Sequence, residues 1–171
     1  MAIWSRIRSR LTLRLRTLLV LVAVVAVGLG VYVDHFRRQE LRRRLAQPII
    51  DAATSGDVAR VRQLLDQGAD VNSVTNGRYP WTPLMNAAFR GNTDVAQLLL
   101  ERGADPNRED GDSFRAMTLA AAFGHWDIVR LLVQHGADTR HGDGFGKTAL
   151  DYAKETGPPE LVRLLGAKQK K

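Results

Sequence analysis

The stretch that decides the fold is the pentapeptide GADVN at residues 68–72, which returns as GADPN at residues 103–107 and as GADTR at residues 136–140. The intervals between the copies are 35 and 33 residues. A second series keeps the same period and precedes each pentapeptide by 12 residues where one follows: Gly56, Gly91, Gly124 and Gly157. Two independent markers with one period near 33 residues indicate an array of helix-turn-helix units joined by hairpins.

The second unit contains the best-defined motif. Residues 82–88 read TPLMNAA and begin nine residues before Gly91. This segment closely resembles the TPLHxAA opening of ankyrin repeats, and the resemblance covers roughly residues 48–166. It implies an ankyrin-like helix-turn-helix solenoid with short β-hairpin loops. The expected fold class is therefore all-α. One transmembrane helix, formed by the apolar segment described below, is expected before the solenoid.

The expected ankyrin repeat domain spans residues 48–167 and precedes a lysine tail at residues 168–171. Its four repeats are expected at about 48–80, 81–113, 114–146 and 147–167. No unit can bury its apolar face alone, so stacking must close one continuous core. The residues expected in that core include Leu99, Leu132, Ala88 and Ala121.

Particular residues are expected to bound each helix. In the second unit, Pro83 stands at a first-turn position, where the missing N–H costs little. Gly91 and Gly103 end the inner and outer helices, because glycine accepts the left-handed conformation of a helix terminus. In the third unit the Thr-Pro pair is replaced by Arg115 and Ala116, which predicts a weaker helix start.

The formal net charge of +7 is unevenly distributed. Residues 1–47 hold ten arginines against Asp34 and Glu40, a net +8, so residues 48–171 carry −1. Because nucleic-acid binding needs a basic surface, the repeats are not expected to bind nucleic acid. The chain has no cysteine, which excludes disulfides and thiolate metal sites.

An uncharged segment at residues 17–33 separates a basic N-terminal segment, residues 1–16, from a second basic flank, residues 34–47. As a helix it would be about 26 Å long, and snorkelling arginines could extend it toward a hydrocarbon core of about 30 Å. We therefore expect a transmembrane helix at 17–33 and a basic juxtamembrane helix at 34–47. The latter should stop near Pro48, because the residue before a proline disfavours helix. The expected anchor residues are Leu18, Leu19, Val20, Leu21, Val24, Val25, Val27, Leu29, Val31 and Tyr32.

A cleaved export signal is the competing interpretation of this segment, since a basic start before an apolar run is typical of such signals. The apolar run continues through Leu29, Val31 and Val33, beyond the small-residue sites around Gly28, and this favours an uncleaved anchor. Five arginines flank the segment on each side, so charge does not decide its orientation. The long following domain favours a cytoplasmic N-terminus and periplasmic repeats, in a single-pass protein of a bacterial inner membrane.

Residues 142–148, GDGFGKT, resemble a phosphate-binding P-loop, but that motif needs four residues between its glycines. Only three residues separate Gly142 from Gly146. The pattern fits the hairpin turn of the repeat better, and nucleotide binding is not expected.

Other candidates for chemistry are weak. Glu109, Asp110 and Asp112 cluster in one hairpin, where a solvated turn is favoured over a calcium site because no bidentate glutamate follows. The histidines show no ligand spacing, and His125, directly after Gly124, is expected to make a structural hydrogen bond. The chain is therefore not expected to be an enzyme or to use a cofactor, a metal or a small-molecule substrate.

Partners of ankyrin-like arrays usually dock on hairpin tips and on the groove-facing ends of inner helices. The first hairpin is longer than its counterparts, since ten positions separate Asn72 from Thr82 against eight for the later ones. The competing interpretation is that aromatics such as Trp81 and Phe114 fold onto the adjacent hairpin and cover the core. Aromatics and arginines are enriched in binding hot spots, and they occupy the free positions, giving these candidate contacts: Arg78, Tyr79, Trp81, Phe89, Arg90, Phe114, Arg115, Phe123 and Phe145.

The sequence thus predicts a membrane-tethered protein–protein interaction module that recruits or scaffolds a partner without catalysis. Its partners would be a protein of unknown identity and the lipid bilayer, the latter through residues 17–33. Two alternatives stay open. The chain could be an accessory or assembly subunit of a larger membrane complex, or a signal-cleaved, exported ankyrin binding protein.

Overall fold

The computed structural model of the chain describes residues 2–74 and 80–169, and side chains over residues 22–74 and 80–168. Within these residues it contains eight helices and no extended strand. The chain divides into two compact units, Met1–Glu40 and Leu41–Lys171.

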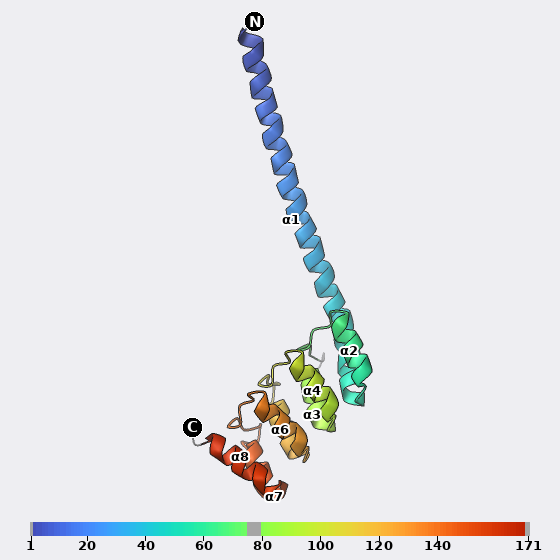
Figure 1. The fold of residues 1–171 in the computed structure, drawn as a ribbon, viewed down its shortest axis with the longest axis vertical. Helices are drawn as coiled ribbons and strands as arrows, with labels where there is room; N and C mark the ends of the chain where they lie inside the picture. The colour runs from blue at the N-terminus through green and yellow to red at the C-terminus, as the bar shows by residue number, and fades with distance from the viewer. Residues whose placement is uncertain (1, 75–79, 170–171) are drawn as a thin grey trace. The chain divides into compact units, whose positions relative to one another are not determined.

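The unit Leu41–Lys171 is built from helix pairs. The last part of α1 (Ala2–Ser55) is followed by α2 (Val58–Asp66), and three further pairs follow: α3 (Pro83–Arg90) with α4 (Thr93–Glu101), α5 (Ala116–Ala122) with α6 (Trp126–Gln134), and α7 (Ala149–Thr156) with α8 (Pro159–Gln169). The two helices of each of these three pairs pack together. The inner helices α3, α5 and α7 pack in one row, and the outer helices α2, α4 and α6 pack in a second (Figure 1). The predicted succession of helical repeats is confirmed.

The core between these rows uses the predicted residues. Leu99 and Leu132, on the outer helices α4 and α6, are 0 % exposed. Ala88 and Ala121, on the inner helices α3 and α5, are also buried. Small side chains on the inner helices let neighbouring repeats pack against one another as densely as residues in other protein interiors do.

The starts of the inner helices differ as the sequence indicates. Thr82 Oγ1 accepts the N–H of Met85 at 3.2 Å and caps α3. Arg115, the corresponding residue before α5, has no side-chain acceptor, and its own N–H donates instead to Thr118 Oγ1 at 3.1 Å. Of the two hydrogen bonds of a capping box, the start of α5 therefore lacks the one that the side chain before the helix accepts. At seven residues, α5 is the shortest of the described helices.

Polar side chains directly after the turn glycines join one repeat to the one before it. Asn92 Nδ2 donates to the carbonyl oxygens of Ala53 at 2.8 Å and Thr54 at 3.1 Å. In the next repeat, His125 Nε2 lies 3.1 Å from the carbonyl oxygen of Phe89. These bonds satisfy carbonyl groups at the ends of the inner helices. The structural role expected for His125 is confirmed.

Two of the turn glycines are needed for different reasons. Gly91 has a φ of +77°, and an added Cβ would meet the His125 ring at 2.7 Å. Gly157 has a φ of −85°, but its Cβ would meet the backbone of Ala153 at 2.7 Å. Pro158 follows it and, unlike Asn92 or His125, has no side-chain donor for the preceding repeat.

The asparagines of the pentapeptides connect successive hairpins. Asn72 Oδ1 accepts the N–H of Asp105 at 2.8 Å, and Asn107 Oδ1 accepts the N–H of Asp138 at 2.7 Å. The expected β-hairpin loops are reduced in the described residues to isolated antiparallel bridges, Glu109–Arg115 and Gly142–Thr148. The hairpins are therefore held as much by these side chains as by strand pairing.

The prediction that the helix stops near Pro48 is wrong, because α1 continues to Ser55. Pro48 occupies the same repeat position as Pro83, which begins α3. A proline is tolerated there when the helix starts at it, but inside α1 it removes one backbone hydrogen bond. The helix nevertheless continues, since the following Ile49 and Ile50 are buried in the core of the repeats. Burial of these side chains offsets the lost bond.

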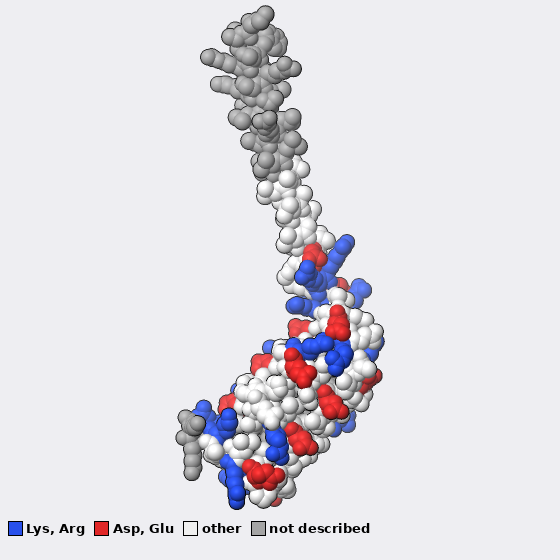
Figure 2. Space-filling view, viewed as in Figure 1, with Lys and Arg blue, Asp and Glu red and all other residues white. Residues whose placement is uncertain are grey.

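The first unit, Met1–Glu40, is helical over its described residues. Four of the predicted anchor residues, Leu18, Leu19, Val20 and Leu21, lie outside the residues whose side chains are described. In the described part of the chain no helix combines the length and the apolar character needed to cross a membrane. Residues 22–33 contain no Lys, Arg, Asp or Glu, and Figure 2 shows a white stretch without charged side chains just below the grey part of this segment. The other six anchor residues are between 61 % and 68 % exposed: Val24, Val25, Val27, Leu29, Val31 and Tyr32.

Candidate protein-binding surface

Three aromatic rings from two repeats lie in contact, and we call Trp81, Phe89 and Phe123 the aromatic row. The ring centres of Trp81 and Phe89 are 5.2 Å apart. Those of Phe89 and Phe123 are 4.5 Å apart, with the ring planes at 75°. This edge-to-face arrangement is favoured by the quadrupoles of the rings. The structure thus brings together three of the predicted contact residues.

The end of the row formed by Phe89 and Phe123 is accessible. Phe123 is 54 % exposed, although it touches Phe89. Arg90 is also exposed, and its guanidinium carbon lies 5.5 Å from the centre of the Phe89 ring, as in a cation–π contact. Arg90 and Phe123 each directly precede a turn glycine, so they occupy equivalent positions in consecutive repeats.

Trp81 has a structural role instead. Its ring packs partly buried against the core, and its Nε1–H donates to Asp110 Oδ2 at 2.7 Å. This bond joins the start of the second repeat to the following hairpin. The alternative that hairpin aromatics cover the core therefore holds for Trp81.

The solvated turn expected around Asp110 is wrong for this residue, which is buried. Its Oδ1 accepts the N–H groups of Asp112 at 2.9 Å and Phe114 at 2.8 Å. With the bond from Trp81, three donors satisfy this carboxylate inside the hairpin. Buried carboxylates require such compensation. Within the described residues no group of three or more potential ligands could hold a metal ion.

Asp143 repeats this arrangement in the next hairpin. It is buried, its Oδ1 accepts the N–H groups of Phe145 at 2.9 Å and Lys147 at 3.0 Å, and its Oδ2 accepts the Tyr152 hydroxyl at 2.7 Å. Burial and the neighbouring carboxylate raise the pKa of Tyr152 to about 12. The sequence analysis did not predict this buried role for either aspartate, although each precedes a glycine and the two lie one repeat period apart.

A second aromatic pair connects the last two hairpins. The ring centres of Phe114 and Phe145 are 6.2 Å apart, with the planes at 74°. Phe114 is partly buried against the core, whereas Phe145 is 82 % exposed. Of the two, Phe145 offers the accessible ring.

Arg115 is held by neighbouring carboxylates. Its Nη2 lies 3.1 Å from Glu109 Oε2, and its Nη1 lies 3.5 Å from Asp138 Oδ2. The hydrogen bond from Arg115, together with the nearby His141, holds the pKa of Glu109 below its usual value. Arg115 therefore links two hairpins and is not free for a partner. Arg78 and Tyr79, in the longer first hairpin, lie outside the described residues.

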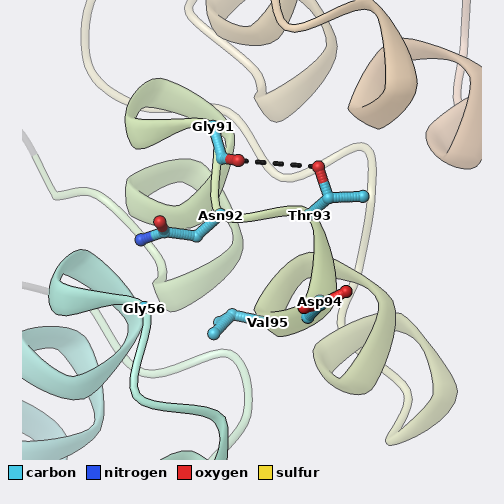
Figure 3. A pocket seen from close by; sticks show the side chains of 6 residues that line it. All are labelled: Gly56, Gly91, Asn92, Thr93, Asp94 and Val95. Carbon is cyan, nitrogen blue, oxygen red and sulfur yellow. Dashed lines mark hydrogen bonds between the residues drawn. The ribbon is translucent and has the colours of Figure 1, made fainter.

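Three pockets of the described residues lie away from the predicted contact residues. One of about 290 Å³ is open to solvent beside the start of α4 and is lined by Gly56 and residues 91–95. Figure 3 shows Asn92 extending toward the Gly56 turn, and Thr93 Oγ1 lies 3.5 Å from the Gly91 oxygen. The Asn92 amide already bonds the preceding repeat. Two further pockets, of about 340 and 280 Å³, likewise have none of the predicted contact residues in their linings.

Comparison with known proteins agrees with this architecture. Residues 33–110 match a family model described as ankyrin repeats (3 copies), and residues 99–153 match one described as ankyrin repeats (many copies). A search of curated proteins gave no match. The two family matches overlap and together run from residue 33 to residue 153, across the helix pairs and hairpins described above. The chain belongs to the ankyrin repeat family.

Proposed function

We propose that the repeats bind a protein partner through the accessible sides of Phe89, Arg90 and Phe123, without catalysing a reaction. The observation that carries this proposal is the 54 % exposure of Phe123 within a ring contact that spans two repeats. Exposed aromatic and arginine side chains are the types on which binding energy concentrates. Ankyrin repeats in general serve as protein–protein interaction modules, which supports this assignment.

We also propose that the chain is tethered to a bilayer through residues 17–33, as a single-pass protein of a bacterial inner membrane with the repeats in the periplasm. Support comes from the exposed apolar side chains between Val22 and Phe36, which have no protein cover in the described residues. Leaving them in water is unfavourable by roughly 25 cal/mol per Å² of apolar surface. A tether would raise the concentration of the repeats near a membrane-bound partner.

The binding surface can be tested by site-specific photocrosslinking in native membranes. A photoreactive residue placed at Phe123 should capture one protein, identified by mass spectrometry. The same residue at Gln97, which is exposed on the outer helix α4, is the matched control. Equal capture at both positions, or capture only at Gln97, would contradict the assignment.

Affinity provides a second test of the same surface. Phe123→Ala should weaken binding of the captured partner by about tenfold, or 1.4 kcal/mol, with little change in thermal unfolding. Trp81→Ala is unsuitable for this purpose, because its bond to buried Asp110 makes a loss of stability the expected result.

The tether can be tested by washing membranes with alkaline carbonate. The full chain should stay in the membrane pellet, and the double variant Val24→Asp, Val27→Asp should lose this behaviour, since a charge at the centre of a bilayer costs about 3 kcal/mol. Release of the unmodified chain by the wash would refute the tether. An N-terminal tag that survives in the membrane fraction would oppose the cleaved-signal alternative.

The exposed apolar helix also supports a second candidate, an accessory subunit whose apolar helix makes the main contacts with a larger membrane complex. Exchanging residues 17–33 for an unrelated apolar helix separates the two. A tethered binder should keep its partner through the Phe123 surface, whereas a subunit of this kind should lose it.

A further inference from the structure

The inner helices α3, α5 and α7 contain four charged residues, Arg90, Asp151, Lys154 and Glu155. Three of them are paired: Asp151 Oδ1 lies 3.4 Å from Lys154 Nζ, and Glu155 Oε1 accepts a bond from Lys147 at 2.8 Å. Arg90 has no hydrogen bond or ion pair to any described residue. Its recorded contact is the face of the Phe89 ring. Among the charged residues of α3, α5 and α7, Arg90 is therefore the one without a counterion in the described part of the chain.

The position of this charge is defined by the aromatic row. The Phe89 ring centre lies 5.5 Å from the Arg90 guanidinium carbon and 4.5 Å from the Phe123 ring centre. The cationic Arg90 and the apolar Phe123 therefore contact the same ring. A guanidinium held over an aromatic ring loses less freedom when it forms a further bond.

A short extended peptide can contact both groups, because the Arg90 guanidinium and the Phe123 ring lie against the same Phe89 ring. In an extended chain, side chains two residues apart point to the same side and lie about 6.6 to 6.8 Å apart. One such side chain can cover the exposed Phe123 ring while the other reaches the Arg90 guanidinium. A carboxylate suits the second place, because an arginine can bind it with two parallel hydrogen bonds.

We propose that the partner supplies an extended acidic segment in which an aliphatic or aromatic residue lies on Phe123 and an aspartate or glutamate two residues away pairs with Arg90. This inference rests on the proposed protein-binding function and adds the chemistry of the partner. Because Arg90 has no counterion in the described residues, it favours an acidic partner segment. An acidic segment would neutralise the guanidinium, whereas a basic one would be repelled by it.

The test is a selection of random short peptides displayed on phage, with the full chain in neutral detergent micelles as the target. Selected peptides should contain Asp or Glu two positions from an apolar residue. Arg90→Glu should weaken binding of a synthetic selected peptide by about tenfold or more, and a new selection on this variant should favour Lys or Arg instead. Arg62→Glu on α2 is the matched control, because Arg62 is also exposed and has no hydrogen-bond or ion-pair partner among the described residues.

The outcomes separate this inference from the function on which it rests. Phe123→Ala should lose the selected peptides, and retention of them would refute the proposed surface. If Phe123→Ala loses the selected peptides but Arg90→Glu binds them as tightly as the parent chain, only the acidic segment is refuted. The same holds if the selected peptides contain no Asp or Glu. A selection that enriches no peptide also refutes the extended segment. Circular dichroism of each variant must show the unfolding midpoint of the parent chain.

Discussion

Valine and leucine side chains are exposed in one region of this molecule and buried in another. Val24, Val27 and Leu29 in α1 are well over half exposed, whereas Val95 and Leu132 in the outer helices are 0 % exposed. All five lie in α-helices. The difference is that each outer helix has a neighbouring repeat to cover it, and the α1 segment has no cover in the described residues.

This comparison shows that burial here is a property of the stacked array. A repeat contributes stability through its own contacts and through the interface with the next repeat. Residues 22–33 have no such interface with the described residues of their own unit, Met1–Glu40. The bilayer proposed above would cover these side chains.

The largest expected effect is on the buried side of the comparison. Leu132→Ala should lower the free energy of unfolding of the repeats by about 2 to 5 kcal/mol, because it leaves a cavity between two repeats. Leu29→Ala, the matched change in the exposed segment, should alter it by less than about 0.5 kcal/mol. Urea unfolding followed by circular dichroism measures both. Equal losses would remove the distinction between the two regions.

Two glycines give the next largest contrast. Gly91→Ala should destabilise the repeats by about 1 to 3 kcal/mol, since alanine must adopt a positive φ and its Cβ meets the His125 ring. Gly28 lies inside α1 with no atom within 4 Å of an added Cβ. Gly28→Ala should therefore leave unfolding of the repeats unchanged and favour the local helix. A tolerated Gly91→Ala in thermal denaturation would contradict the observed turn.

Removing a hydrogen bond should give a smaller difference in stability between the repeats and the α1 segment. Trp81→Phe should cost about 1 to 2 kcal/mol, because Asp110 Oδ2 loses its donor while the carboxylate remains buried. Tyr32→Phe is the control, since the Tyr32 hydroxyl has no hydrogen-bond partner in the described residues. Its unfolding midpoint in urea should match that of the parent chain. If Trp81→Phe also matches, the Asp110 bond contributes nothing.

The smallest expected effect appears only at high pH. The folded-state pKa of Tyr152, about 12, lies above the ordinary value of 10.0, so the folded state holds the proton more tightly. The resulting stabilisation is complete below pH 10 and is lost as the pH rises toward 12. Tyr152→Phe should show a shallower decline in stability between these values. Parallel curves for variant and parent in urea titrations would refute the assigned role of Tyr152.

Much of the repeat architecture could be predicted from the sequence. The glycine period located the turns, and the burial of Leu99 and Ala88 followed from their positions in the repeat. The stop at Pro48 was wrong because a local rule on prolines ignored the burial of Ile49 and Ile50 just after it. Tertiary packing outweighed the local preference there.

The candidate surface was less predictable. The rings of Phe89 and Phe123 were named from the sequence, and the structure brings them into contact. Trp81 was also named as a contact residue, but its partner is Asp110, 29 residues away. A side chain at a hairpin can face a partner or the core with equal ease, so the local sequence cannot distinguish the two.

What the sequence determined by itself is the period and the residue types that a repeat requires, because turn glycines and small helix residues are local needs of the backbone. The tertiary structure decided which polar groups are used internally and which stay accessible. Asp110 and Arg115 bond within and between hairpins, whereas Arg90 has no charged partner among the described residues. This division depends on contacts between residues of different repeats, whose distances are set only when the repeats stack.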